Sequence, residues 1–322
     1  MANFFDDKYV FIEKKVSLNY NQYRIDSFLA DLYPQISRKQ WQSRIALHLV
    51  SLNDKHIKHS KRIKVNDIVK FQFEKREEPT VNSNYEIVYQ DDFCIIVNKP
   101  SDLPIHPSGI YFENTLVTLL KRDLGLDFLA AVNRIDRETT GLVLFATNPT
   151  YFSKFQIALK TSHKFYLVAV HGDYKMALSQ KGFIGNDTRS RVHKKQKFTL
   201  MTKNKLVPTE YEKTSHTLFR NILKDHNYSL LMAKLKTGRT HQIRATLCSL
   251  GFPVVGDKIY GRDESIFIRF INGKLLAKDW EVLKIRHTAL HAYSLSFFHP
   301  YFEKQIKIKA KLPSSLSGLF WK

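Results

Sequence analysis

The chain has 322 residues, 43% of them hydrophobic, which is enough for one large folded domain or two ordinary ones. Its 51 basic residues outnumber 30 acidic ones, and the formal net charge of +21 favours a polyanionic partner, nucleic acid above all. No apolar run approaches the length of a membrane span, and the amino terminus lacks the features of a signal peptide, so we expect a cytoplasmic protein with no membrane partner.

Residues 17–75 form the first predicted domain. An amphipathic segment ends at Pro34, and Ser37 then stands where a helix N-cap is expected, so the pattern predicts two short helices. Strand chemistry follows, with a turn at Asp54–Lys55 and alternating apolar residues over 63–73. The result is a small ααβ unit of roughly 60 residues, near the lower limit for a domain that folds alone.

Residues 76–84 are polar, contain one proline and lack apolar periodicity, which predicts a linker to a second domain over 85–322. Several strands of this domain follow one another without a helix between them, so we predict an α+β fold with a mixed, largely antiparallel sheet. The predicted strands lie at 86–99 (two strands around an Asp-Asp turn), 141–147, 163–172, 228–236, 289–299 and 305–312, and the predicted helices lie at 151–160 and 237–251.

The stretch AVNRIDRETTGLVLFATN, residues 131–148, carries the strongest chemical signal. Asp136 lies between Arg134 and Arg137 in a polar loop, just before Gly141 and a buried strand. Two neighbouring arginines favour the ionised carboxylate and should lower its pKa, which suits a nucleophile or a base better than a proton donor. From the residues alone, a buried ion pair, a surface loop and a catalytic carboxylate all remain open.

Five blocks resemble the RluA-type RNA pseudouridine synthases and occur in that family's order. NRIDRETTGLVLFATN resembles the catalytic-loop motif, and LKTGRTHQIRATLCSLGFPVVGDKIYG resembles the C-terminal motif. IVNKPSDLPIHPSG, KFYLVAVHG and LHAYSLSFFHP are similar to three further segments, so the resemblance covers about 85–300. The stretch SRKQWQSRIALHLVSLNDKHIKHSKRIKVNDIVKF is in turn similar to an S4 domain, an RNA-binding module.

The resemblance implies an enzyme that converts uridine in RNA to its C-glycoside isomer. The N1–C1′ bond must break, the uracil must turn, and C5 must then bond to C1′, with Asp136 acting at the ribose of a flipped-out uridine. The family also implies that Arg244 pairs with Asp136, that Tyr166 stacks on the uracil, and that Arg134 enters the helix that the nucleotide leaves. Asn133 stands where the family has histidine.

RNA is the expected partner, with large-subunit ribosomal RNA favoured and transfer RNA as the alternative. Basic side chains on the S4-like segment and near Asp136 are suited to neutralise phosphates. A further run, residues 189–205, contains seven basic residues and no acidic one, and is either an RNA contact or a surface hairpin. The predicted RNA-binding residues are Arg38, Lys39, Arg44, Lys61, Arg62, Asn133, Arg134 and Arg137.

We expect no cofactor and no metal, because the chain has no nucleotide-binding glycine motif, and Cys94 and Cys248 lie outside metal-ligand spacing. A monomer is the expected state. Two rival functions are an inactive RNA-binding or ribosome-assembly protein that keeps the synthase fold, and a hydrolase that uses Asp136 and Glu138 as a carboxylate pair. Residues 261–287 are longer than a simple connection needs and have no assigned role.

Overall fold

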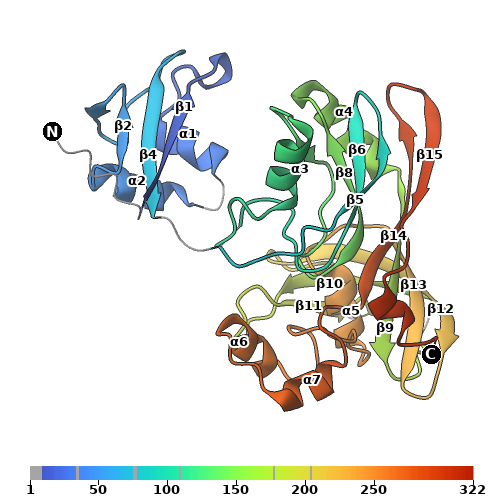
Figure 1. Cartoon of the computed structure of the whole chain (residues 1–322). Helices are drawn as coiled ribbons and strands as arrows, with labels where there is room; N and C mark the ends of the chain where they lie inside the picture. The colour runs from blue at the N-terminus through green and yellow to red at the C-terminus, as the bar shows by residue number, and fades with distance from the viewer. Residues whose placement is uncertain are drawn as a thin grey trace. The chain divides into compact units, whose positions relative to one another are not determined.

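The computed structural model describes residues 9–33, 36–74, 78–108, 110–176, 178–203 and 205–321, which divide into two compact units (Figure 1). The first unit combines the described residues up to Thr80 with the segment Pro107–Thr115, and the second combines Val81–His106 with the residues from Leu116 onwards. The segment 107–115 therefore groups with the first unit, although composition puts it in the second domain. None of the described helices is both long and apolar enough to cross a bilayer.

One layer of the first unit is a four-stranded antiparallel sheet with the order β1-β4-β2-β3. No strand is predicted before residue 17, but β1 pairs with β4 along its whole length, so the sheet begins earlier in the chain than expected. This pairing joins segments that are distant in sequence, which local periodicity does not report. The strands are β1 (Tyr9–Lys15), β2 (Val50–Leu52), β3 (Lys55–His56) and β4 (Ile68–Glu74).

The turn between β2 and β3 lies one residue earlier than predicted. Leu52 pairs with Lys55, so the turn residues are Asn53 and Asp54, with φ angles of 50° and 62°. Asn and Asp enter this left-handed region more readily than other residues with a side chain, and two successive positive φ angles are the requirement of a type I′ hairpin turn. The Asn53 side chain also accepts the Ile68 N–H at 2.8 Å, which ties the turn to β4.

The two predicted helices of the first unit are confirmed as α1 (Ile25–Leu32) and α2 (Arg38–Ala46), preceded by the 3-10 turn η1 (Leu18–Tyr20). The Ser37 side chain accepts the Gln40 N–H and the Gln40 side chain accepts the Ser37 N–H, which completes a capping box. Pro34, where the first helix is predicted to end, lies outside the described residues. Trp41 is fully buried and meets Phe71 of β4 edge to face, so the helices and the sheet share one core.

The second unit is built on an eleven-stranded sheet in which every pairing is antiparallel except β8 with β14. The predicted mixed, largely antiparallel sheet is therefore confirmed. Its strand order is β11-β10-β12-β13-β9-β14-β8-β6-β5, with β15 on β14 and β7 on β8. The strands are β5 (Glu86–Gln90), β6 (Cys94–Lys99), β7 (Ala130–Ala131), β8 (Thr140–Ala146), β9 (His163–His171), β10 (Ser179–Asn186), β11 (Gln196–Leu200), β12 (Lys213–Lys224), β13 (Tyr228–Leu235), β14 (Leu290–His299) and β15 (Lys304–Lys309).

The parallel pairing of β8 with β14 fixes the end of the loop that carries Asp136. Gly141 has a φ of +106° and lies opposite Ala292, and a Cβ added to it would lie 2.4 Å from the Ala292 carbonyl oxygen. Only glycine permits both this conformation and this approach. Next to it, the Thr140 hydroxyl lies 2.8 Å from Nδ1 of His291 on β14. The loop therefore leads into a strand that is anchored at its first residues.

Helices cover the second sheet, and two of them, α4 and α5, occur where they are predicted. Residues 261–287, which have no assigned element in the sequence, contain α6 and α7, joined by an ion pair of Arg269 with Asp279 at 2.6 Å. The connection is thus a folded helical pair. The helices are α3 (Leu116–Leu124), α4 (Pro149–Lys160), α5 (Gln242–Ser249), α6 (Ser265–Ile271), α7 (Ala277–Leu283) and α8 (Ser314–Ser317).

Candidate active site

A cavity of about 1000 Å³ opens in the second unit, and the loop with Asp136 forms part of its wall. The end of α4 with the start of β9, the segment that follows β13, the first turn of α5 and Leu290 form the rest. Among the described residues, Asp136 is the only carboxylate that lines it, whereas seven lining residues are cationic, so the cavity attracts an anionic ligand. These cations are Arg134, Lys160, Lys164, Lys234, Lys236, Arg239 and Arg244.

Asp136 and Arg244 are brought together as the resemblance implies. Arg244 donates from its terminal nitrogen to Oδ2 of Asp136 at 2.8 Å, and its side chain is only 7% exposed. The Asp136 carboxylate is a third exposed, at 33%, and thus remains accessible from the cavity. A single oxygen, Oδ1, is left without a bond to the arginine.

A second carboxylate, that of Asp257, holds the other edge of the same guanidinium. Arg244 donates to its two oxygens at 2.6 and 2.8 Å, and Asp257 also accepts the backbone N–H groups of Ile259 and Tyr260. Asp257 is fully buried in the core of the unit. A bidentate pair of this kind fixes the plane of the guanidinium, and so fixes the direction from which it binds Asp136.

The pKa of Asp136 is lowered by residues that are distant in the sequence. Burial is the largest single effect and acts to raise the pKa of this carboxyl, but the charge of Arg244, His241 and the hydrogen bond from Arg244 together outweigh it. The expected direction of this pKa is thus confirmed, whereas Arg134 and Arg137 are not among its main causes. Arg134 is exposed on the cavity wall, and Arg137 pairs with Asp102 at 3.3 Å, outside the cavity lining.

His241 contacts the oxygen of Asp136 that Arg244 leaves open. Its Nε2 lies 3.7 Å from Oδ1 of Asp136, and its Nδ1 lies 2.9 Å from the Tyr260 hydroxyl. That hydroxyl already accepts the Gln196 N–H, so its own proton is directed to Nδ1 and the proton of the imidazole lies on Nε2, toward Asp136. Burial and the nearby Arg244 charge lower the pKa of His241 to about 4, which keeps the ring neutral at neutral pH.

Tyr166 lines the same cavity from β9, and its side chain is almost fully buried at 8% exposure. Burial, together with the negative charge of Asp136, raises the pKa of its hydroxyl to about 12. The phenol is therefore protonated throughout the neutral range. A rigid aromatic ring beside a carboxylate is suited to stack on a planar base whose sugar reaches that carboxylate.

Two residues, Asn133 on the cavity wall and Lys99 outside it, support the loop. The Asn133 side-chain amide accepts the Leu144 N–H at 2.7 Å and donates to the Leu142 carbonyl at 3.3 Å. Both polar atoms of this side chain, which we expected to bind RNA, therefore bond to strand β8. Lys99 is buried and donates to the carbonyls of Pro100 and Arg137 at 2.7 and 2.9 Å. Burial lowers the pKa of the Lys99 amine to about 7, against the attraction of Asp136.

The carboxylate pair of the hydrolase alternative does not form. Lys258 binds both oxygens of Glu138 at 2.9 Å, and Glu138 is absent from the cavity lining, so it does not face the same space as Asp136. Arg137, predicted as an RNA contact, lies on this side as well, within 3.7 Å of Glu138. The hypothesis of two cooperating carboxylates in this loop is therefore wrong.

The predicted RNA-binding residues of the first unit differ in whether their side chains already have partners within the protein. Arg38 binds the buried Asp26 at 3.1 Å, and Arg44 donates to the Gln72 carbonyl, so both have structural partners. Arg62 donates to the Gln22 carbonyl at 2.7 Å. Lys39 and Lys61 are exposed.

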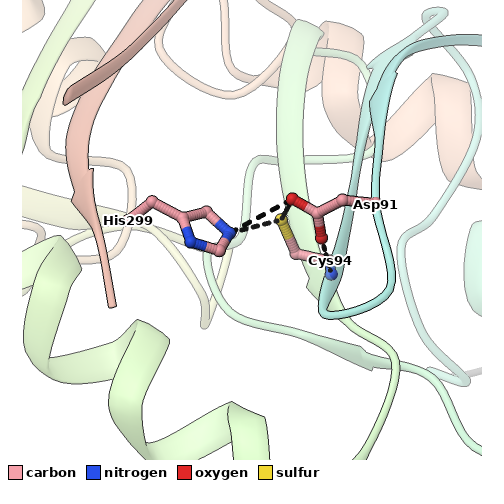
Figure 2. Close-up of side chains that lie close together, drawn as sticks. All are labelled: Asp91, Cys94 and His299. Atoms are coloured by element: carbon pink, nitrogen blue, oxygen red, sulfur yellow. Dashed lines mark hydrogen bonds and ion pairs between the residues drawn. The ribbon is translucent and has the colours of Figure 1, made fainter. Parts of the chain in front are cut away.

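One cluster outside the cavity has the residue types of a metal site: Asp91, Cys94 and His299 (Figure 2). Nε2 of His299 lies 3.2 Å from Asp91 Oδ2 and 3.9 Å from the Cys94 sulfur. Nδ1 of the same ring accepts the N–H groups of Tyr301 and Phe302, so the ring proton lies on Nε2 and points at Asp91. A metal on Nε2 would have to replace that proton, and the hydrogen bonds already account for the cluster.

The sequence alone assigns no role to Asp257, His241 or Tyr260. All three lie within the C-terminal block that resembles the synthase family, but carboxylates and histidines are common in loops, and nothing local in VVGDKIYG or GRTHQIR links them to Asp136. Their contacts join positions far apart in the chain. Only the fold assigns them to one site.

We expect Asp257→Asn to lower kcat/KM for the reaction at this site by about 100-fold, because the amide no longer fixes Arg244 and so no longer fixes Asp136. Asp279→Asn is the matched control, since Asp279 is equally buried and binds Arg269 through both oxygens, away from the cavity. Both variants should melt at a lower temperature in differential scanning calorimetry. Equal activity losses in the two would contradict a positioning role of Asp257.

The chain resembles known RNA pseudouridine synthases in sequence and in fold. A family model described as RNA pseudouridylate synthase matches residues 93–249. A protein of Aquifex aeolicus named as an uncharacterized RNA pseudouridine synthase is 32% identical over 292 residues, covering 86% of each chain. Ribosomal large subunit pseudouridine synthase D of Haemophilus influenzae is 30% identical over 307 residues, covering 92% of this chain and 90% of that protein.

Among solved structures, human RNA pseudouridylate synthase domain containing 1 shares the fold with a TM-score of 0.56 and 24% sequence identity, covering 74% of this chain and 89% of that one. The predicted pseudouridine-synthase-like α+β fold is thereby confirmed. The 32% identity to the Aquifex aeolicus protein over 86% of both chains shows the family as well as the fold. The chain belongs to the RNA pseudouridine synthase family and is an enzyme of that class.

Proposed function

We propose that this enzyme isomerises uridines in large-subunit ribosomal RNA, with Asp136 acting at the ribose of a uridine flipped into the cavity. The observation that carries the proposal is the ion pair of Asp136 with the buried Arg244 on the wall of a cation-rich cavity. The pair keeps a carboxylate ionised and aimed while one of its oxygens stays open. Tyr166, on the same wall, supplies the surface on which the uracil stacks.

The chemistry assigns a distinct task to each group. The N1–C1′ bond breaks, its electron pair leaves with the uracil, and Oδ1 of Asp136 forms an ester bond to C1′. The uracil then turns on Tyr166, and C5 bonds to C1′ as the ester bond breaks and returns its electron pair to the carboxylate. C5 finally loses its proton to solvent, and N1 takes one up. Because the pKa of Asp136 is lowered, its carboxylate is a weak base. We propose that Asp136 adds to C1′; removal of the C2′ proton is the alternative, and an ester-linked adduct would distinguish the two.

The name of the Haemophilus influenzae relative supports large-subunit ribosomal RNA as the substrate. The test uses transcripts of large-subunit ribosomal RNA, small-subunit ribosomal RNA and transfer RNAs, each with tritium at C5 of uridine, because bond formation at C5 releases the label. We expect release from the large-subunit transcript alone. Release from transfer RNA alone would replace the proposed substrate, and binding without release from any RNA would favour the inactive RNA-binding alternative.

We also propose that the first unit is an S4-like clamp for RNA phosphates, with Lys39 and Lys61 among its contacts. Both side chains are exposed and lie on a unit with two helices and a small sheet. Changing both to glutamine should reduce the slope of log K against log salt by about 1.4–1.8, or 0.7–0.9 per phosphate, in filter-binding titrations. Lys307 and Lys309, exposed on β15 of the second unit, form the control pair with the same change in charge. An equal reduction in both pairs would contradict the clamp.

A further inference from the structure

A second, smaller cavity of about 260 Å³ adjoins the first in the same unit. The end of β10, the start of β11 and the start of β12 form it, and the residues 238–240 line both cavities. Three consecutive residues span at most about 10 Å, so the two cavities lie close together. An RNA strand with one nucleotide in the large cavity therefore places a neighbouring nucleotide at the small one. Nothing in the mechanism at Asp136 uses this second cavity.

Tyr211 stands at the edge of the small cavity with 83% of its surface exposed. The segment that carries it is well fixed, because Glu212 accepts hydrogen bonds from Lys205 at 2.8 Å and from the Thr209 N–H at 3.0 Å. It also lies close against β10, since a Cβ on Gly185 would be 3.0 Å from the Tyr211 carbonyl oxygen. A large aromatic ring is thus held in an exposed position instead of packing into the core.

The polar groups around this ring match a nucleotide. Lys213 and Arg239 are exposed at the cavity, and Arg239 is fixed by its bond to the Thr214 carbonyl at 3.0 Å. No carboxylate lines the space in the part of the chain that the structure describes. Gln196 donates to the Asn186 side-chain oxygen at 2.7 Å. The remaining amide N–H groups of Asn186 and the side-chain oxygen of Gln196 have no partner among the described residues, so they can bind the edge of a base.

We propose that the small cavity binds an unpaired nucleotide that flanks the target uridine in the same RNA strand, with its base stacked on Tyr211 and its phosphate near Lys213 and Arg239. This inference rests on the proposed function and adds a second RNA subsite to it. Any base can stack on an aromatic side chain, whereas hydrogen bonds from the side-chain amides of Asn186 and Gln196 would favour particular bases. Because residues 238–240 line both cavities, they fix the distance between this nucleotide and the uridine that meets Asp136.

The test uses a short RNA with one target uridine, tritiated at C5 and taken from the site that the wild-type enzyme modifies, and a set of the same RNAs in which each flanking nucleotide in turn is abasic. We expect Tyr211→Ala to raise KM about 10-fold on the intact RNA, about 1.4 kcal/mol, with kcat nearly unchanged. Tyr211→Phe should behave as wild type. On the RNA that lacks the stacked base, wild type and Tyr211→Ala should have the same KM.

Phe298→Ala is the control, because Phe298 is also an exposed aromatic residue, at 52%, but lies on β14 and lines neither cavity. The subsite is refuted if Tyr211→Ala matches wild type on intact RNA, or if it loses the same factor on every abasic RNA. The second result would point to a contact with the backbone or with another protein. Absence of tritium release by wild type would instead overturn the proposed function, so the two failures are distinct.

Discussion

Asp136→Asn is expected to reduce tritium release from C5-labelled RNA by at least about 10⁴-fold, the order of loss seen when a reacting side chain is removed from an enzyme. An amide cannot add to C1′, and it carries no charge to stabilise the electron-poor ribose. The fold should persist, because Arg244 keeps its bidentate bond to Asp257. We expect the melting temperature and the salt-dependent affinity for RNA to stay close to those of wild type.

The matched control for this prediction is Asp102→Asn. Asp102 belongs to the same unit, pairs with Arg137 at 3.3 Å, and lies outside the cavity lining, so its loss should leave tritium release unchanged. A second readout tests the chemical step itself. Rapid quenching followed by denaturing electrophoresis should detect an ester-linked RNA–protein adduct with wild type and none with Asp136→Asn. Equal release by the two proteins would remove Asp136 from the mechanism.

Arg244→Gln should give the largest combined loss of stability and activity in the chain. Asp257 is fully buried and relies on this guanidinium, and a buried charge that loses its partner costs about 3–5 kcal/mol of unfolding free energy. For a unit of this size the melting temperature should fall by on the order of 10 °C. Below that temperature, kcat/KM should fall about 100-fold or more, because Asp136 is no longer aimed.

A pH profile separates positioning by Arg244 from a purely structural role. In wild type the pKa of Asp136 is lowered, so its carboxylate is ionised across the neutral range and kcat/KM should be level there. Without Arg244, burial and the charge of Asp257 raise the pKa of Asp136 and only His241 opposes them, so the residual activity of Arg244→Gln should increase as the pH rises. Arg269→Gln, which breaks the pair with Asp279, should lose stability and keep the level profile. The same level profile in Arg244→Gln would contradict the assignment.

The regular elements that local patterns specify were predictable. Ser37 before α2 and Gly251 after α5 are helix-end signals that depend on a few adjacent residues, and β8 is apolar after Thr140 because both of its faces are buried. The strands β1, β10 and β12 were not predictable in this way. They form through pairing with partners elsewhere in the chain, and their side chains alternate too weakly to stand out.

By itself the sequence determined that the protein is basic, that its second half is α+β, and that Asp136 lies in a loop at the start of a buried strand. The pairing of Asp136 with Arg244 was available only through the resemblance to the synthase family, because the two residues are 108 positions apart. Only the tertiary structure decided that Arg244 serves two carboxylates, that His241 contacts the open oxygen, and that Arg137 and Glu138 face elsewhere. The physical reason is the separation along the sequence over which each effect acts. Helix caps and apolar periodicity depend on a few adjacent residues. A buried charge is instead satisfied by whichever partner the packed sheet brings within about 3 Å, at any distance along the chain.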